Sequence, residues 1–89
     1  MAKSKIITYD LCNSGKNYSA LYEYIKSFDK WARITESVWF ISSDKTCSTI
    51  RDEANKIIDL DDRFFVADLT GAGAWRNVRC KNDYLLKNL

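Results

Sequence analysis

The order of hydrophobic and polar positions predicts a first strand followed by a helix. Residues 6–11 are apolar, β-branched or aromatic apart from a single Asp, which is typical of a strand. After a polar turn, apolar side chains recur at the i, i+3, i+4, i+7 and i+10 positions of a helix over residues 17–30. They are Tyr18, Leu21, Tyr22, Ile25 and Phe28. We therefore expect one face of this helix to lie on the sheet.

The middle of the chain predicts further strand, a second helix and another strand. Residues 33–43 alternate with the period of a strand, and they are long enough for one strand or for two short strands joined near Ser37. Residues 46–59 repeat the amphipathic pattern of a helix, and residues 63–69 form the next apolar run. Because near-continuous apolar runs suit burial on both faces, we expect the first strand and the 63–69 strand at the centre of the sheet.

These elements give a β-α-β-α-β order, and hence an α+β fold, in a single domain of residues 1–89. The tail, residues 74–89, is expected to add a short strand that a dimer could exchange, or an irregular or helical segment around Tyr84, Leu85 and Leu86. Two helices of this length cover only one face of a three- or four-stranded sheet. Since a chain this short buries a marginal core by itself, we expect the other face to meet a second subunit in a homodimer.

Composition excludes several catalytic classes but leaves the partner open. The chain has 14 basic and 12 acidic side chains, a net charge of +2 that neither requires nor excludes a nucleic acid. It has no histidine, so it cannot supply a Ser-His-Asp triad, a Cys-His pair or an imidazole metal site. Cys12, Cys47 and Cys80 form no CxxC pair, and we expect them to be reduced and largely buried thiols.

The chain shows no sign of export or of a membrane span. The first five residues, Met-Ala-Lys-Ser-Lys, lead into an apolar run that is too short for a secretory signal. No segment reaches the length of about 18 apolar residues that a membrane-spanning helix requires. We therefore expect a cytoplasmic protein with no membrane partner.

Asp10 is the first candidate functional residue, because a carboxylate inside an apolar strand lowers strand propensity and is costly to desolvate. Its side chain could accept backbone hydrogen bonds from the turn at residues 13–15. Alternatively, it could hold a metal ion, and a symmetric dimer would bring two such carboxylates together. Asp68 occupies the corresponding place near the end of the 63–69 strand, and the same two interpretations apply to it.

A basic segment near the C-terminus is the second candidate. Residues 74–81 contain Trp75, Arg76, Arg79 and Lys81. Cations interleaved with an aromatic ring suit a phosphate backbone and a base face, so these four residues are candidate nucleic-acid contacts. The alternative is a solvated edge whose charges resist edge-to-edge pairing.

Three short segments keep the order and spacing of a known family. Tyr9-Asp10-Leu11 ends the first strand, Glu36-Ser37-Val38-Trp39 begins the strand after the first helix, and Asp-Arg-Phe-Phe-Val at residues 62–66 lies in the next strand. Over residues 5–69 the chain resembles the small CRISPR-associated "Cas-two" family, together with the related VapD toxins and the Cas-two-like proteins of bacteria and phages.

The resemblance implies a ferredoxin-like sheet with two helices on one face, a homodimer formed through the sheets, and a sheet-end Asp associated with a divalent metal ion. By residue-to-residue transfer, Asp10 takes the metal position and Ser37 that of the strand-two serine. Some members are metal-dependent endoribonucleases or deoxyribonucleases, and others are non-catalytic scaffolds in spacer integration. Residues 17–30 lack the dense basic run of many CRISPR members, which favours a stand-alone relative.

The leading hypothesis is therefore a Cas-two-like cytoplasmic homodimer that binds RNA or DNA and has Mg²⁺-dependent endonuclease or endoribonuclease activity. Asp10 would be the catalytic and metal-holding residue. Without histidine, a general acid or base would have to be a carboxylate, a lysine, a tyrosine or metal-bound water. The alternatives are a non-catalytic protein-interaction or scaffold module and a toxin or antidefence component. The sequence leaves open whether the chain is catalytic and whether it prefers RNA or DNA.

Overall fold

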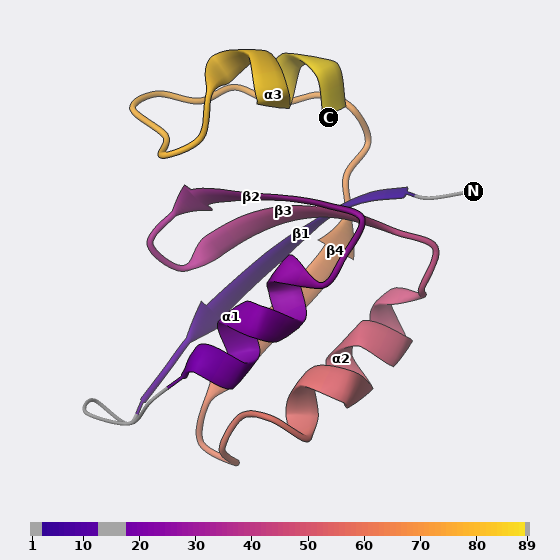
Figure 1. Ribbon diagram of the computed structural model, residues 1–89, viewed down its shortest axis with the longest axis vertical. Coiled ribbons are helices and arrows are strands. Elements are labelled where there is room, and N and C mark those ends of the chain that lie inside the picture. Colours follow the sequence, from indigo (N-terminus) through magenta and orange to yellow (C-terminus); the bar gives the residue numbers. More distant parts are fainter. Residues whose placement is uncertain (1–2, 13–17, 89) are drawn as a thin grey trace.

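The computed structural model describes residues 3–12 and 18–88, which form an α+β domain built on one four-stranded antiparallel sheet (Figure 1). The strand order across the sheet is β2-β3-β1-β4. In chain order the elements are β1 (Lys3–Asp10), α1 (Ser19–Lys26), β2 (Lys30–Thr35), β3 (Val38–Ser43), α2 (Cys47–Asn55), β4 (Arg63–Asp68) and α3 (Asn82–Asn88).

The main hydrophobic core lies between the sheet and the helices α1 and α2, which cover the same face (Figure 1). On β1 and β3 the side chains of alternate residues point into it, as the period of a strand requires. The buried members of this core are Ile7, Tyr9, Leu21, Ile25, Phe28, Trp39, Ile41 and Ile50. The predicted placement of two helices on one face is therefore confirmed.

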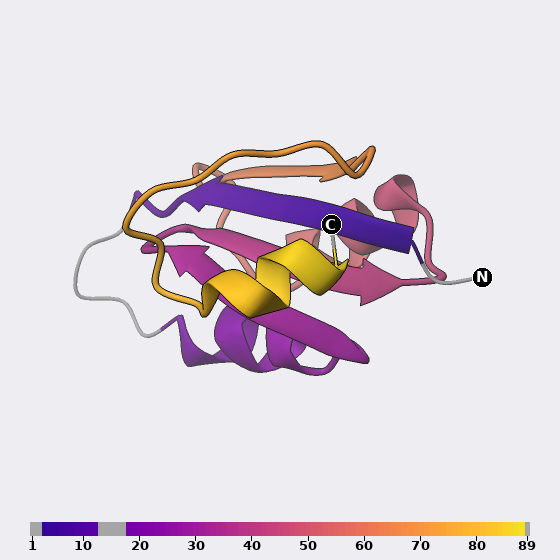
Figure 2. The ribbon, with the colours of Figure 1, turned by 90° about the horizontal axis from the view of Figure 1, so that it is seen from above.

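The opposite face is partly covered by α3 (Figures 1 and 2). Leu85 is 2 % exposed, and the ring of Tyr84 meets that of Phe40 edge to face with centroids 5.7 Å apart. Within the described residues 69–88 there is no strand, so the tail is irregular up to α3 and then helical. Part of the surface that was expected to stay open for a second subunit is thus filled by the chain's own C-terminal helix.

The expectation that the 63–69 strand is central is wrong. β1 pairs with β3 on one side and β4 on the other, whereas β4 has no other partner strand among the described residues. The reason is that β3 and β4 take the two sides of β1, and the described tail, residues 69–88, adds no strand on the outer side of β4. The apolar run of β4 is consequently not buried on both faces, and Phe65 is 58 % exposed.

Residues 30–43 form a β-hairpin rather than one long strand. β2 and β3 are joined by a turn at Glu36 and Ser37, and the register shifts between Arg33 and Thr35. The carbonyl oxygen of Ser37 accepts a hydrogen bond of 3.2 Å from the backbone amide of Tyr9. The turn is therefore held against the end of β1.

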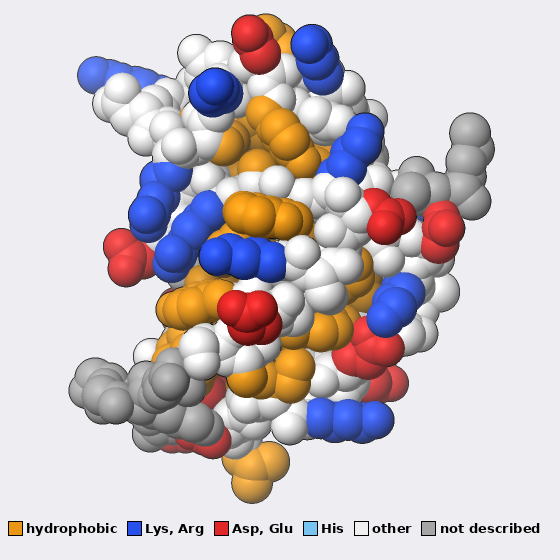
Figure 3. All heavy atoms as spheres, viewed as in Figure 1, with side chains coloured by type: hydrophobic (Ala, Val, Ile, Leu, Met, Phe, Trp, Pro, Cys, Tyr) orange, Lys and Arg blue, Asp and Glu red, His pale blue; other side chains and the backbone are white. Residues whose placement is uncertain are grey.

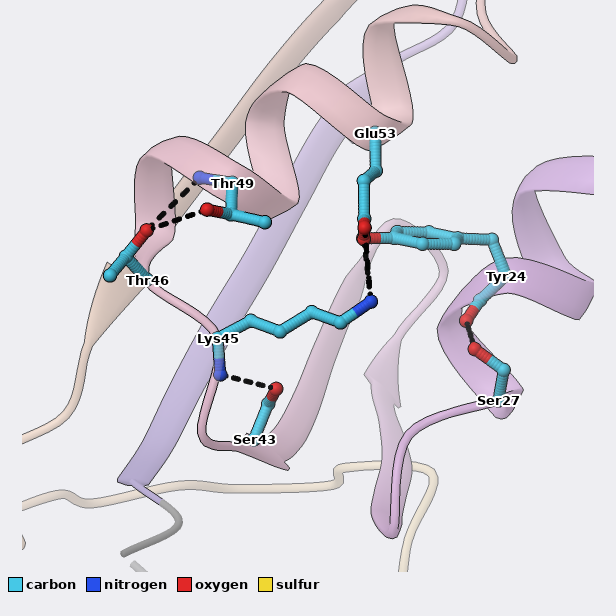
Figure 4. Close-up of polar contacts among 7 residues, drawn as sticks. All are labelled: Tyr24, Ser27, Ser43, Lys45, Thr46, Thr49 and Glu53. Atoms are coloured by element: carbon cyan, nitrogen blue, oxygen red, sulfur yellow. Dashed lines mark hydrogen bonds and ion pairs between the residues drawn. The ribbon is translucent and has the colours of Figure 1, made fainter.

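Both long helices are shorter than their apolar patterns predict. α1 ends at Lys26 and α2 at Asn55, and the apolar residues beyond each end pack from turns. The hydroxyl of Thr46 caps α2 by accepting a hydrogen bond from the amide of Thr49 at 3.2 Å (Figure 4). No helix in the described part of the chain is long and apolar enough to span a membrane.

Candidate nucleic-acid interface

Asp10 lies at the C-terminal end of β1 and is exposed. In the register with β4 it stands opposite Arg63, so its carboxylate ends the apolar run of β1 instead of interrupting a buried strand. This position removes the desolvation cost that a buried Asp would carry. The turn at residues 13–15, which could supply backbone donors to Asp10, lies outside the described residues.

Two hollows meet at Asp10. One, of about 160 Å³, lies on the β4 side and includes Arg63 and Phe65 in its lining. The other, of about 250 Å³, lies towards the β2–β3 turn and is lined by Tyr9, Asp10, Leu11, Tyr22, Arg33, Glu36 and Ser37. The structure thus brings together Asp10 and Ser37, the two positions that the family resemblance singles out.

The described residues of one chain do not surround Asp10 with further metal ligands. They contain no group of three Asp, Glu, Cys or His side chains that could hold a metal ion, and none of them gives the Asp10 carboxylate a hydrogen bond or an ion pair. A single carboxylate is a poor Mg²⁺ site by itself, because this cation keeps octahedral geometry with several oxygen ligands. A metal at Asp10 would need further oxygen ligands, from a second copy as the resemblance implies, from water or from the phosphates of a substrate.

Arg33 supplies positive charge in the lining of the second hollow. Its guanidinium lies 5.2 Å from the ring centroid of Tyr22 and 5.1 Å from that of Trp39. Nε and Nη2 both donate to the carbonyl oxygen of Glu36, at 3.0 and 2.6 Å. A cation held over aromatic faces and fixed by two hydrogen bonds presents its charge in one orientation.

The aromatic residues beneath Arg33 are fixed by their own hydrogen bonds. The buried indole Nε1 of Trp39 donates to the hydroxyl of Tyr9 at 3.0 Å, and that hydroxyl lies 3.4 Å from the carbonyl oxygen of Glu36. Burial raises the pKa of Tyr9, so the phenol stays protonated over a wider range of pH. Sequence reasoning missed this arrangement, because the hairpin register is what places Arg33 opposite Trp39.

The basic tail segment is attached to the same edge of the sheet. The amide of Arg79 donates to the carbonyl oxygen of Ile34 in β2 at 2.8 Å, next to Arg33 in the chain. Arg76, Arg79 and Lys81 are all exposed. Trp75 is half-buried, and its Nε1 donates to Asn82 at the start of α3 at 3.0 Å. The three cations are thus available to a ligand, whereas the Trp75 indole nitrogen serves to hold the tail to α3.

Asp68 has a structural partner. Its carboxylate lies 2.7 Å from the ammonium of Lys5 and also accepts from the Cys47 thiol at 3.6 Å. The hydrogen bond and charge of Lys5 hold the pKa of Asp68 below its usual value, and burial followed by the charge of Asp68 raises the pKa of the Cys47 thiol. Asp68 is therefore engaged by the side chains of Lys5 and Cys47, instead of by the backbone donors of a turn.

Cys12, Cys47 and Cys80 are free thiols, as expected, but none of them is buried, since Cys12 is exposed and Cys47 and Cys80 are half-buried. It lies just beyond the end of β1, where its thiol donates to the carbonyl oxygen of Asp61 at 3.1 Å.

Comparisons of the chain with protein-family models, with curated proteins and with solved structures find no match.

Proposed function

We propose that this chain is a nucleic-acid-binding protein with a ferredoxin-like fold that acts as a homodimer and is related to the Cas-two family. Two features support the fold assignment. Without α3, the order of elements is β-α-β-β-α-β, and the antiparallel sheet has the strand order β2-β3-β1-β4. The short segments around Tyr9-Asp10, Ser37 and residues 62–66 support the family assignment.

The observation that carries the binding function is the attachment of the basic tail beside Arg33. The bond from the Arg79 amide to Ile34 brings a segment with three exposed cations to the edge where Arg33 lies over Tyr22 and Trp39. Arg and Lys side chains neutralise phosphates, and binding then gains from the release of counterions. Arg33 reaches this edge from the helix-covered face of the sheet and the tail is attached to the same strand, so a polyanion that follows the edge would meet both.

The homodimer is supported by the state of β4. This strand has no partner on its outer side among the described residues, and Phe65 is 58 % exposed on it. An edge strand with an exposed aromatic side chain is prone to pair with another chain. A second copy on this edge would cover Phe65 and extend the sheet.

The second candidate is Mg²⁺-dependent cleavage of the bound nucleic acid. It is favoured by the exposed carboxylate of Asp10, which none of the described residues engages. The chemistry that bound Mg²⁺ supplies is activation of water and neutralisation of charge on the phosphodiester. Asp10 from each of two copies would hold the ion. The alternative, from a different class of protein, is a non-catalytic protein-interaction or scaffold module. Binding to nucleic acid distinguishes the proposed function from this alternative.

The test is the salt dependence of binding to RNA and DNA oligonucleotides, measured by fluorescence anisotropy. Replacing Arg76, Arg79 and Lys81 together by Ala should weaken binding and lower the magnitude of the salt slope by about 0.7–0.9 for each phosphate that is no longer neutralised. The matched control replaces Lys3, Arg51 and Lys56, which are exposed on other parts of the chain, and it should change the slope much less. If the wild-type protein has no salt-sensitive affinity for any oligonucleotide, the proposal is wrong and the interaction-module alternative stands.

A further inference from the structure

Trp31 is a large aromatic side chain on an edge strand with 40 % of its surface exposed. It lies on β2, the strand at the opposite edge of the sheet from β4. Its ring centroid is 5.9 Å from that of Trp39, with the two planes inclined at 51°, and the ammonium of Lys26 lies 5.4 Å from it. An exposed indole flanked by a cation is a suitable surface for a nucleobase.

Trp31 is the outer end of a row of aromatic rings that runs from the core to the surface. The row continues inwards through Trp39, Tyr22 and Tyr9, with centroid separations of 6.2 Å between Tyr22 and Trp39 and 6.4 Å between Tyr9 and Tyr22. Trp39 is 1 % exposed and Tyr9 is 5 % exposed, so the inner rings are fixed by packing. Trp31 therefore rests on a fixed neighbour and keeps 40 % of its surface exposed to a ligand.

The segments around Trp31 have an excess of positive charge. Residues 26–36 and 79–87 contain six cations against the three carboxylates of Asp29, Glu36 and Asp83. The cations are Lys26, Lys30, Arg33, Arg79, Lys81 and Lys87. Figure 3 shows Lys and Arg side chains among apolar side chains on the side of the molecule where α1 and the β2–β3 hairpin lie.

Direct contacts bring these two segments to the same edge. The amide of Arg79 donates to the carbonyl oxygen of Ile34 at 2.8 Å. The ammonium of Lys30 donates to the side chain of Asn88, the last residue of α3, at 3.1 Å. A hollow of about 280 Å³ between β2 and α3 has Ala32, Lys81 and Lys87 in its lining. We define the β2 edge as residues 26–36 together with residues 79–87.

We infer that the β2 edge binds single-stranded nucleic acid, with a base stacked on Trp31, one phosphate at Lys26 and further phosphates on the other cations of the edge. The inference rests on the proposed nucleic-acid-binding function and specifies its substrate. A base in a duplex has both faces covered by its neighbours, whereas an unpaired base can stack on an aromatic side chain. The Lys26 ammonium beside the exposed indole, with the other cations farther along the β2 edge, suits a strand that alternates phosphate and base.

The experiment compares single-stranded and duplex oligonucleotides of the same length, as both DNA and RNA, by fluorescence anisotropy. Trp31→Ala should weaken single-strand binding by about 5- to 150-fold and leave duplex binding and the salt slope unchanged, because stacking involves no counterion. Trp31→Phe should recover part of the affinity. Leu60→Ala removes an exposed large apolar side chain outside the β2 edge and outside the proposed dimer contact, and it should have no such effect. Light scattering and circular dichroism check that each variant has the same mass and the same fold as the wild-type protein.

A second measurement keeps the inference testable if Trp31→Ala does not fold. Stacking of a base on an indole quenches its fluorescence, so a single-stranded oligonucleotide should quench the wild-type protein. The quenching should be lost in Trp31→Phe and retained in Trp75→Phe. Loss in Trp75→Phe alone, or an equal loss of single-strand and duplex affinity in Trp31→Ala, would overturn the inference while leaving the proposed function intact. Absence of all binding by the wild-type protein would instead remove the proposed function.

Discussion

The ammonium of Lys5 lies 2.7 Å from a carboxylate oxygen of Asp68, and only 3 % of the Lys5 side chain is exposed. The two residues face each other in the register of β1 and β4, on the side of the sheet covered by the helices. The Asp68 side chain is 49 % exposed, so the pair joins a buried cation to a half-solvated carboxylate. A buried charge that loses its partner is strongly destabilising, whereas replacing the charge by an apolar group of similar shape is often neutral.

The first prediction follows from that asymmetry. Asp68→Asn should lower the urea midpoint of unfolding at pH 7, because it keeps the shape of the side chain but leaves the Lys5 ammonium without a countercharge. Lys5→Met should lower it less, because the buried charge itself is removed. Circular dichroism during urea titration measures both. Equal stability of Asp68→Asn and the wild-type protein, together with a large loss in Lys5→Met, would show that the pair contributes by packing alone.

The second prediction concerns the pH dependence of the same pair. The pKa of Asp68 is lowered from 3.8 by its hydrogen bond to Lys5, so the ionised carboxylate stabilises the folded state. This contribution is present above the unfolded-state pKa and is lost as the pH falls through the lowered folded-state pKa. The difference in stability between the wild-type protein and Asp68→Asn should therefore shrink as the pH falls from neutral to well below 3.8. A difference that stays constant over this range would contradict the assignment.

A third prediction comes from the contact between the two long helices. The hydroxyl of Tyr24 donates to the carboxylate of Glu53 at 2.7 Å, and Lys45 donates to the same group at 2.9 Å (Figure 4). Burial, followed by the hydrogen bond and charge of Glu53, raises the pKa of Tyr24 above its ordinary value of 10.0. The stability gained from the protonated phenol is present below that value and is lost as the pH rises through the raised pKa.

Alkaline titration of tyrosinate absorbance checks the prediction. Tyr24→Phe should remove an ionisation at the high-pH end, and Glu53→Gln should move that ionisation to lower pH because the carboxylate charge is gone. Tyr9 and Tyr84 also have raised pKa values through burial, and they should be unaffected by Glu53→Gln. A high-pH ionisation that survives in Tyr24→Phe unchanged would assign it to one of these two residues instead.

The fourth prediction tests the cap of α2. Thr46→Ala removes the acceptor for the amide of Thr49 and should reduce the free energy of unfolding by about 0.5–2 kcal/mol. Thr46→Ser keeps the hydroxyl and should recover most of this loss. Denaturant titration of the three proteins measures the difference. Equal losses in the Ala and Ser variants would mean that the methyl group of Thr46, and not the cap, is responsible.

Much of the fold follows from local sequence patterns, because strands and helices bury alternate or periodic side chains. The apolar faces around Ile7, Leu21 and Ile50 predict β1, α1 and α2 and the side of the sheet on which the helices lie. Strand order does not follow from such patterns. Phe64 and Phe65 indicate a buried strand equally well at the centre and at the edge, and β4 lies at the edge because the described tail adds no strand beside it.

The candidate site was predictable only in part, for a related reason. The polarity of Asp10 and of the tail cations marks them directly in the sequence. Arg33 and Trp31 carry no such mark, since their role depends on the register that sets them beside Trp39 at the edge of the sheet. The contact between Arg79 and Ile34 joins segments 45 positions apart through backbone atoms, which side-chain patterns do not encode.

The last prediction separates binding from catalysis at Asp10. Asp10→Asn keeps the size of the side chain and removes its negative charge. Binding to RNA or DNA should persist or strengthen, because one repulsive charge beside the phosphates is gone. If the protein cleaves nucleic acid with Mg²⁺, Asp10→Asn should abolish cleavage, since the carboxylate is the group expected to hold the ion.

Gel analysis of end-labelled oligonucleotides with Mg²⁺ or with a chelator measures cleavage, and anisotropy measures binding on the same samples. Asp44→Asn is the matched control, because it makes the same charge change at the far end of β3 and should leave both readouts as in the wild-type protein. Chelator-sensitive cleavage that survives in Asp10→Asn would exclude Asp10 as the metal-holding residue. Binding without cleavage in both the wild-type protein and Asp10→Asn would support a nucleic-acid-binding protein without nuclease activity, because Asp10 would then act only as a charge at the rim of the site.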